Sequence, residues 1–281
     1  MNGAKKFREL MSAPGAVVCP GVYDALGARI VEDTGFKAFY MTGNGAMASL
    51  LGKPDMGLAT MTEMVTRAHQ LASCVDIPII CDADTGYGGL INVRRTVEEF
   101  EAAGAAGIHI EDQIVQKRCG ALGNVQVVSL QDAAARIEMA VKSRRSEDFF
   151  IIARTDSKSS YGLDEAIRRA RLFAQVGADA VMVEGLDSMD EIRQVAEAVE
   201  IPMLFNIYER RAQDAYKVSE LEAAGVKIII NCLTSTLYSA AILKKLYRDF
   251  YESGTTAAYV EKMLPMAEYT RILGIERELN L

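Results

Sequence analysis

Histidine and tryptophan are nearly missing from this 281-residue sequence, which has no tryptophan and two histidines, His69 and His109. Two histidines exclude a histidine-rich metal site and leave few ways to build a Ser-His-Asp triad. His109 lies inside an apolar run, and we expect it to be a core or supporting residue. The five cysteines are scattered and include no C-x-x-C pair. Their distribution argues against a disulfide framework or structural zinc site and predicts a reducing, cytoplasmic environment.

Long apolar runs and an excess of positive charge are absent as well. No stretch approaches the run of about 18 apolar residues that predicts a membrane-spanning helix. The N-terminal sequence MNGAKKFREL has no apolar run after its charges, so we expect no signal peptide. A net charge of −7 argues against binding to nucleic acid or an anionic membrane. We therefore expect a small molecule as the partner.

What the sequence does contain is a series of short, β-prone apolar runs separated by amphipathic stretches. Nearly continuous apolar runs are typical of strands that are buried on both faces of a parallel sheet. The runs occupy residues 16–21, 39–43, 77–84, 107–112, 149–156, 178–185, 201–207 and 226–232. Three helical stretches, at 96–107, 163–179 and 218–227, carry a glycine near the C-terminal end. A glycine there ends a helix and turns the chain into the next strand.

Eight such strand–helix units predict an α/β fold, a (β/α)8 TIM barrel. A doubly wound open sheet is the alternative, but no G-x-G-x-x-G motif follows the first strand. No linker divides the chain, so we predict a catalytic barrel over residues 1–253 and a C-terminal helical extension of the same domain over 254–281. The apolar residues of this extension, such as Met263 and Met266, need burial, and we expect them to pack on another subunit.

Acidic residues follow the apolar runs at the expected C-terminal strand ends, where a barrel places its chemistry. Asp82 and Asp84 end the third run, and Glu111 ends the fourth. A buried charge is costly unless it is paired or bound to a metal, and carboxylates suit Mg²⁺ or Mn²⁺. Asp82 and Asp84 are two residues apart, so we expect them to point to one side of the pleat. The alternative is that these acids are only helix caps and loop residues.

Five motifs occur in order along nearly the whole chain. They are TGNGAMASLLGKPDMG (42–57), CDADTGYGG (81–89), IEDQ (110–113), QKRCG (116–120) and ARTD (153–156). In these segments the chain resembles the isocitrate lyase/phosphoenolpyruvate mutase superfamily, with its D-x-D-x-G-[YF]-G metal motif and K-[KR]-C-G-H signature. The D-x-D-x-G-Y-G motif together with I-E-D-Q is specific to this superfamily, whereas either motif alone is weak. The resemblance implies a Mg²⁺-dependent enzyme and a homotetramer in which paired subunits exchange the C-terminal helix.

The resemblance also implies a role for each matching residue. Asp82 would be the principal Mg²⁺ ligand, and Asp84 and Glu111 would hold metal-bound waters. Asp55 would approach this shell from a loop at the mouth of the site. Arg154 would pair with the substrate, because its planar guanidinium suits a carboxylate. The other residues expected at the substrate, besides Asp82, are Tyr40, Thr42, Gly43, Asn44, Gly120, Glu184 and Asn206.

Cys119 is the candidate proton donor. Superfamily members with the cysteine signature are mostly carbon–carbon lyases that act on 2-hydroxy di- and tricarboxylates. Cleavage leaves a carboxylate-stabilised carbanion, which Cys119 would protonate, while Lys117 and Arg118 would stabilise the resulting thiolate. The base that deprotonates the substrate hydroxyl stays open among Asp55, Tyr40, Glu184 and a metal-bound water.

Three positions depart from the superfamily pattern. Ala121 replaces the histidine after C-G, Tyr208 replaces a hydroxyl residue, and Leu237 stands where an arginine would hold a further carboxylate. These changes favour a smaller or more apolar substrate, such as 2,3-dimethylmalate, which would be cleaved to pyruvate and propionate. 2-Methylisocitrate lyase activity is the first alternative, and oxaloacetate decarboxylase or C–C hydrolase activity is the second. A barrel that binds a dicarboxylate without turnover is the alternative from another functional class.

Overall fold

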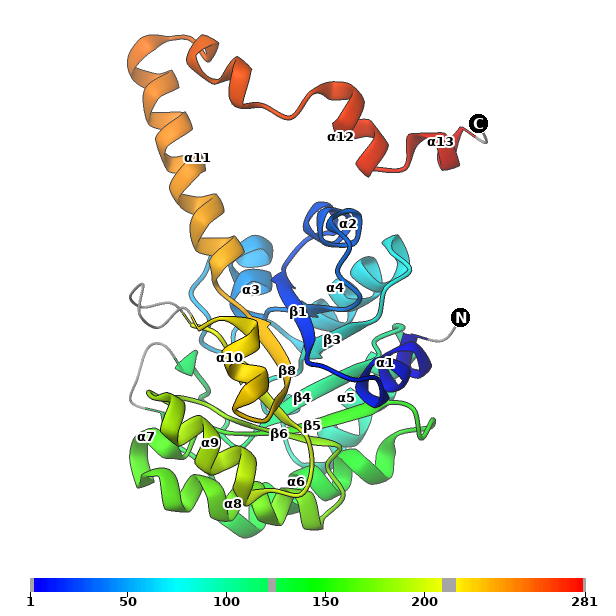
Figure 1. The fold of residues 1–281 in the computed structure, drawn as a ribbon, viewed down its shortest axis with the longest axis vertical. Coiled ribbons are helices and arrows are strands. Elements are labelled where there is room, and N and C mark those ends of the chain that lie inside the picture. The colour runs from blue at the N-terminus through cyan, green and yellow to red at the C-terminus, as the bar shows by residue number, and fades with distance from the viewer. Residues whose placement is uncertain (1–2, 121–124, 209–215, 280–281) are drawn as a thin grey trace.

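The computed structural model describes residues 3–120, 125–208 and 216–279. Its parallel strands form a closed barrel in the order β1 to β8 (Figure 1). The strands are β1 Val17–Val22, β2 Phe39–Met41, β3 Ile79–Asp82, β4 Gly107–Glu111, β5 Phe150–Thr155, β6 Ala180–Val183, β7 Met203–Asn206 and β8 Val226–Asn231. The barrel closes where β1 pairs with β8, with Val17 opposite Ile228. The predicted TIM barrel is confirmed, and the open-sheet alternative is wrong.

Helices alternate with the strands and pack around the outside of the barrel (Figure 1). They are α2 Ala25–Thr34, α3 Gly43–Leu51, α4 Met61–Cys74, α5 Leu90–Ala102, α6 Leu130–Ser143, α7 Lys158–Tyr161, α8 Leu163–Gln175, α9 Met189–Ala198 and α10 Val218–Ala223. The predicted helix-ending glycines Gly104, Gly177 and Gly225 have φ angles of 92°, 98° and 90°. This left-handed conformation suits glycine, which confirms the predicted helix ends.

The core has two layers, as alternation along a closed barrel requires. Side chains such as Cys19, Ile80 and Leu204 fill the barrel interior, and Phe100 and Phe173 pack between strands and helices. The N-terminal helix α1 Gly3–Ser12 was not predicted from the sequence. Its Phe7 is fully buried and meets Phe150 edge to face, with ring centroids 5.2 Å apart. The apolar face of α1 therefore joins the core of the barrel.

The chain after β8 forms a C-terminal arm, residues 234–279, which extends away from the barrel (Figure 1). It contains α11 Thr234–Ser253, η3 Ala257–Lys262, α12 Met266–Ile272 and α13 Ile275–Glu278. Two hydrogen bonds, of 2.6 and 2.9 Å, join the Arg271 guanidinium to the Asp33 carboxylate and so tie α12 to α2. Neither α11 nor α12 has a buried residue. Tyr251 is 91% exposed and Met266 is 72% exposed, so this arm leaves much apolar surface uncovered.

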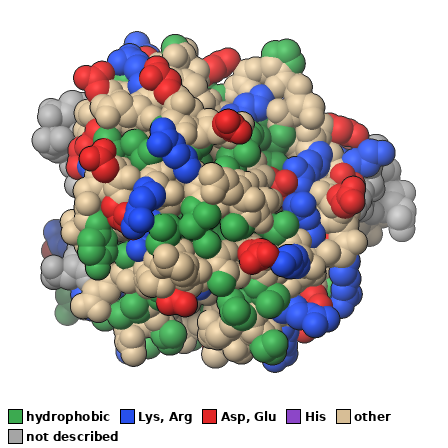
Figure 2. All heavy atoms as spheres, turned by 90° about the horizontal axis from the view of Figure 1, so that it is seen from below, with side chains coloured by type: hydrophobic (Ala, Val, Ile, Leu, Met, Phe, Trp, Pro, Cys, Tyr) green, Lys and Arg blue, Asp and Glu red, His purple; other side chains and the backbone are tan. Residues whose placement is uncertain are grey.

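Figure 2 shows acidic and basic groups interspersed among apolar ones on the face that it presents, without one continuous basic field. Among the described helices, none has the length and apolar character needed to cross a membrane.

Candidate active site

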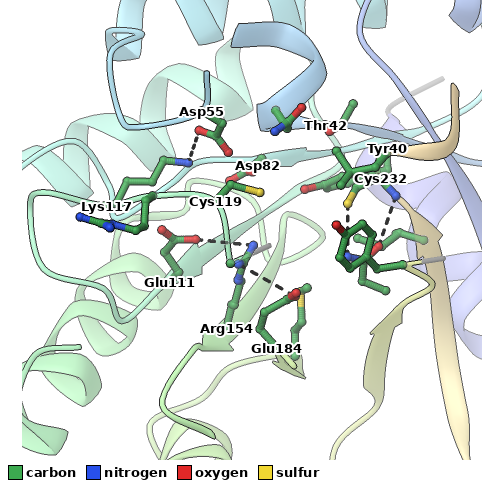
Figure 3. Close-up of a pocket in the computed structure, with 18 residues that line it drawn as sticks. Tyr40, Thr42, Asp55, Asp82, Glu111, Lys117, Cys119, Arg154, Glu184 and Cys232 are labelled. Atoms are coloured by element: carbon green, nitrogen blue, oxygen red, sulfur yellow. Dashed lines mark hydrogen bonds and ion pairs between the residues drawn. The ribbon is translucent and has the colours of Figure 1, made fainter. Parts of the chain in front are cut away.

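A cavity opens at the C-terminal ends of the strands, and residues from the ends of β2 to β8 or the loops after them line it (Figure 3). It is lined by Tyr40, Thr42, Asn44, Asp55, Asp82, Glu111, Lys117, Arg118, Cys119, Gly120, Arg154, Met182, Glu184, Asn206, Tyr208, Ile230, Cys232 and Leu233. This cavity thus brings together all the predicted site residues except Gly43 and Asp84, both of which lie next to Asp82. Residues as distant in sequence as Tyr40 and Asn206 meet here because neighbouring parallel strands end at one edge of the barrel.

Asp82 and Asp84 do not share one side of a pleat. β3 ends at Asp82, and Asp84 adopts a left-handed backbone conformation with φ of 48°, so strand alternation no longer applies. The Asp84 backbone N–H donates to Asp82 Oδ1 at 3.0 Å. Asp82 lines the central cavity, whereas Asp84 lines a neighbouring one. The expectation of two parallel carboxylates is therefore wrong in geometry, although the two residues remain in contact.

Lys117 joins two carboxylates at the border of the cavity. Its Nζ lies 2.7 Å from Asp55 Oδ1 and 2.5 Å from Asp84 Oδ1, and its side chain is 4% exposed. Burial works against the charged amine, but Asp84 and the other acids nearby raise the pKa of Lys117 well above its ordinary value. Lys117 is therefore a fixed cation that is paired with carboxylates. The sequence had predicted instead that it stabilises the thiolate of Cys119.

Burial and charge set the protonation of the acids in opposite directions. Burial raises the pKa of Asp84 to about 6, although Lys117 opposes the shift. Burial also raises the pKa of Glu111 well above its ordinary value, against the pull of Arg154. For Asp82, burial is outweighed by His109, Lys117 and Arg154, which lower its pKa to about 2. Of these three carboxylates, Asp82 is thus the one held most firmly as an anion.

The acidic groups fit a divalent cation. The buried acids Asp55, Asp82, Asp84 and Glu111 outnumber the buried cations that face them. Within the described residues, Glu111 Oε1 is buried without a hydrogen-bond donor, which is costly unless a cation or its water meets it. No three His, Cys, Asp or Glu side chains in the described ranges converge to form a complete ligand set. An all-oxygen set with few direct ligands suits Mg²⁺, which keeps several of its waters.

The N-terminus of α3 borders the same cavity. Thr42 caps this helix, and its Oγ1 accepts a hydrogen bond from the Gly45 N–H at 3.4 Å. A side chain at Gly43 would place its Cβ 2.3 Å from Asp82 Oδ2, so only glycine permits this approach. Backbone N–H groups at a helix N-terminus attract anions. The predicted carboxylate-binding segment therefore lies beside the predicted metal ligand.

Arg154 is the buried cation of the opposite wall, between Glu111 and Glu184 (Figure 3). Its Nε and Nη2 donate to the two carboxylate oxygens of Asp156 at 3.0 and 2.8 Å. Its Nη1 lies 3.5 Å from Glu111 Oε2, and its Nη2 lies 3.9 Å from Glu184 Oε2. The two hydrogen bonds to Asp156 fix the plane of the guanidinium in the cavity.

The loop after β4 brings Cys119 to the cavity. The Cys119 N–H donates to the backbone oxygen of Asp55 at 3.0 Å. The Gln113 side chain accepts from the Arg118 N–H and donates to the Arg118 carbonyl, both at 3.0 Å. These contacts hold the Q-K-R-C-G segment against the 42–57 segment. Ala121, one of the three positions that depart from the superfamily pattern, lies outside the described residues.

His109 supports the site from within the barrel. Its Nε2 lies 2.7 Å from Tyr40 Oη and 3.7 Å from Asp82 Oδ1. Burial lowers the pKa of His109 to about 4, so the imidazole is neutral at physiological pH. The predicted core or supporting histidine is therefore found beside two predicted site residues.

An apolar wall of Met182, Ile230 and Leu233 completes the cavity and was missed from the sequence. Cys232 was missed as well, and its Sγ accepts a hydrogen bond from Asn206 Nδ2 at 3.2 Å. Period-two alternation could have revealed part of this wall, because Met182 precedes Glu184 by two residues. Leu237, by contrast, is 57% exposed in α11 and is not part of the lining.

Comparisons with known proteins show the family to which this chain is similar. The family model described as phosphoenolpyruvate phosphomutase matches residues 7–249. The chain is 39% identical to the 2,3-dimethylmalate lyase of Eubacterium barkeri over 99% of this chain and 96% of that protein. It is 38% identical to the 2-methylisocitrate lyase of Aeropyrum pernix over 95% of this chain and 86% of that protein. A solved structure of oxaloacetate acetylhydrolase with its product oxalate is 36% identical, with a TM-score of 0.92 over 99% of this chain and 96% of that one.

Proposed function

Because this chain belongs to the phosphoenolpyruvate mutase/isocitrate lyase superfamily, we propose that it is a Mg²⁺-dependent carbon–carbon lyase acting on a 2-hydroxydicarboxylate. The substrate that fits best is 2,3-dimethylmalate, which cleavage between C2 and C3 would convert to pyruvate and propionate. The observation that carries this proposal is one cavity holding Asp82, Glu111, Arg154 and Cys119 together. Similarity to proteins named as lyases supports the same class of reaction.

The acidic side of the cavity would hold the metal and the reacting end of the substrate. Asp82 is the proposed direct ligand of Mg²⁺, and Asp84 and Glu111 would hold its waters. When bound, Mg²⁺ would supply Lewis-acid stabilisation of negative charge on the substrate's hydroxyl oxygen. Backbone N–H groups at Thr42, Gly43 and Asn44 would orient the adjacent carboxylate.

Cys119 would complete the reaction as the general acid. The hydroxyl proton of the substrate would pass to a base of the site as the C2 carbonyl of pyruvate forms. The electron pair of the broken C2–C3 bond would stay on C3 of the departing fragment, next to that fragment's carboxylate. The Cys119 thiol would donate its proton to that carbon and become a thiolate, which regains a proton from solvent. Arg154 would hold a substrate carboxylate, because its guanidinium is fixed and faces the cavity.

The charge of the cavity favours a dicarboxylate over 2-methylisocitrate, which has three carboxylates. Lys117 lines the cavity but is already ion-paired with Asp55 and Asp84. Arg154 and Arg118 are then the lining cations of the described chain that would meet the carboxylates of the substrate. The apolar wall of Met182, Ile230 and Leu233 suits the methyl groups of 2,3-dimethylmalate.

A product assay tests the proposed function. Purified protein would be incubated separately with 2,3-dimethylmalate, 2-methylisocitrate and oxaloacetate, with Mg²⁺ or with excess EDTA, and the keto-acid and carboxylate products identified by mass spectrometry. We expect pyruvate and propionate from 2,3-dimethylmalate with Mg²⁺ only. Turnover of another of the three would reassign the substrate, and unchanged activity in EDTA would refute the metal-dependent mechanism.

The C-terminal arm supports a further part of the proposal, a homotetramer of helix-exchanged dimers. The arm has no buried residue in α11 or α12 and exposes residues such as Tyr251 and Met266. A second subunit would cover this apolar surface. We propose residues 1–253 as the catalytic barrel, 254–281 as the oligomer contact, and the cytoplasm as the compartment, since all five cysteines are free thiols. Analytical ultracentrifugation should find a tetramer, and a stable monomer would count against this assembly.

A further inference from the structure

Asp112 lies directly after Glu111 but outside the cavity, and it is 1% exposed. Its side chain forms hydrogen bonds to the end of the neighbouring strand β5. One carboxylate oxygen accepts from Thr155 Oγ1 at 2.6 Å, and the other accepts from the Asp156 backbone N–H at 2.9 Å. The Asp112 backbone N–H donates to the Arg154 carbonyl at 3.2 Å. Asp112 therefore contacts three consecutive residues, of which the first is the buried arginine of the site.

Arg169 of α8 completes this cluster from the other side. Its Nη1 donates to Asp112 Oδ2 at 2.9 Å, and its side chain is 5% exposed. Its Nη2 donates to the carbonyl of Val128 at 2.9 Å, and the Val128 N–H donates to the Asp112 carbonyl, also at 2.9 Å. Val128 lies where the segment that carries Cys119 returns to the barrel. One buried ion pair thus anchors both the end of β5 and the base of this segment.

We propose that Asp112 and Arg169 are positioning residues that orient Arg154 in the cavity. The Arg154 guanidinium takes its direction from Asp156 through two hydrogen bonds, and the backbone of Asp156 takes its position from Asp112. Neither Asp112 nor Arg169 lines the cavity, so they act through Arg154 and not on the substrate. This inference rests on the proposed function, because it assumes that Arg154 binds a carboxylate of the ligand.

The physical argument is one of preorganisation. A buried ion pair is costly to desolvate, and a pair of well-packed apolar residues is often equally stable, so the pair is weak as a stability device. Its charges, however, fix directions through hydrogen bonds that apolar side chains cannot make. Groups that hold a ligand-binding residue in place typically change affinity or activity by about 10- to 100-fold when removed. We expect an effect of that size at Arg154.

The test measures Mg²⁺-dependent binding of oxalate by calorimetry and, with the substrate that the wild type cleaves, kcat and KM. We expect Asp112→Asn and Arg169→Gln to raise the Kd for oxalate and the KM by about 10-fold or more. Arg168→Gln is the matched control, because Arg168 is on the same helix, pairs with the same Glu165 and has a 62% exposed side chain. It should leave both constants unchanged.

A double-mutant cycle separates positioning from general destabilisation. In an Arg154→Lys background, Asp112→Asn should have no further effect on oxalate affinity, since the residue that it orients is already altered. An equal loss of affinity in both backgrounds would overturn the proposal. If Asp112→Asn fails to fold, Thr155→Val removes one hydrogen bond to Asp112 without a change of charge and enters the same cycle. We expect it to weaken oxalate binding in the same background-dependent way.

The result also distinguishes this inference from the proposed function. A wild-type protein that binds oxalate with Mg²⁺ but cleaves none of the three substrates would refute the proposed reaction, and the cycle would still decide the role of Asp112. A wild-type protein that does not bind oxalate would overturn the role of Arg154 and, with it, this inference.

Discussion

Replacing Lys117 with methionine should destabilise the protein strongly, because it removes the cation that joins two buried carboxylates. Lys117 Nζ lies 2.7 Å from Asp55 and 2.5 Å from Asp84, and all three side chains are 4–6% exposed. Removing one partner from a buried ion pair costs about 3–5 kcal/mol, because the remaining charge is left uncompensated. Domains are typically stable by about 5–15 kcal/mol, so the variant should retain little margin. Methionine keeps most of the aliphatic volume, so the loss reports the charge.

The loss should also depend on pH, in a direction set by Asp84. Burial raises the pKa of Asp84 to about 6 with Lys117 present, and removing Lys117 should raise it further. A carboxyl whose pKa is higher in the folded state destabilises the fold when it is ionised, and this cost disappears as the pH falls through the folded pKa. The deficit of Lys117→Met in free energy of unfolding should therefore be largest above the raised pKa of Asp84 in the variant, shrink as the pH falls through that pKa, and be smallest below about pH 6.

Urea unfolding in EDTA at neutral and acidic pH measures this deficit. Lys142→Met is the control, because Lys142 Nζ lies equally close to a carboxylate, 2.5 Å from Glu138, but its side chain is 68% exposed. Water screens that pair, so its loss should leave the free energy of unfolding unchanged. Added Mg²⁺ should restore part of the stability of Lys117→Met, since a bound cation replaces the missing charge. A Lys117→Met protein as stable as the wild type in EDTA at neutral pH would refute the reasoning.

Three further predictions concern the metal and the proton donor. Gly43→Ala should weaken Mg²⁺ binding measured by calorimetry, because the new Cβ would lie 2.3 Å from Asp82 Oδ2. Gly89→Ala is the control, since its Cβ would meet open space, and it should leave the Mg²⁺ affinity unchanged. Equal Mg²⁺ affinities of the two variants would contradict this prediction. Cys119→Ala should abolish cleavage while retaining Mg²⁺-dependent oxalate binding, and full turnover would remove the cysteine from the mechanism. Mg²⁺ affinity should fall as the pH drops through about 6, because protons compete with the metal at Asp84; constant affinity from neutral to acidic pH would oppose this.

Much of the fold followed from local patterns. The apolar runs predicted all eight strands, and Gly104, Gly177 and Gly225 predicted the helix ends, because both signals depend on neighbours in the chain. The helix α1 was missed because it precedes the first strand and so lies outside the strand–helix repeat, and the burial of its Phe7 depends on the distant Phe150. A short helix gives a weak signal until the rest of the barrel is present.

The candidate site, like the fold, was predicted in part from local sequence patterns. Motifs predicted which acids stand at the strand ends, and they pointed to Cys119 and Arg154, both of which line the cavity. The prediction that Asp82 and Asp84 point to one side of the strand was wrong, because the backbone turns into a left-handed conformation at Asp84. A glycine at this position would have predicted such a turn, whereas an aspartate does not.

The sequence by itself determined the barrel, the superfamily and the chemical inventory of the site, because spacing along one chain is enough to specify each of them. Only the tertiary structure decided which groups pair. Lys117 meets Asp55 and Asp84, His109 meets Tyr40, and Asp112 holds the end of β5. Such contacts depend on the register in which eight strands close, and on burial, which makes an unpaired charge costly and a paired one stable. Pairing is therefore a property of the closed barrel that no single segment encodes.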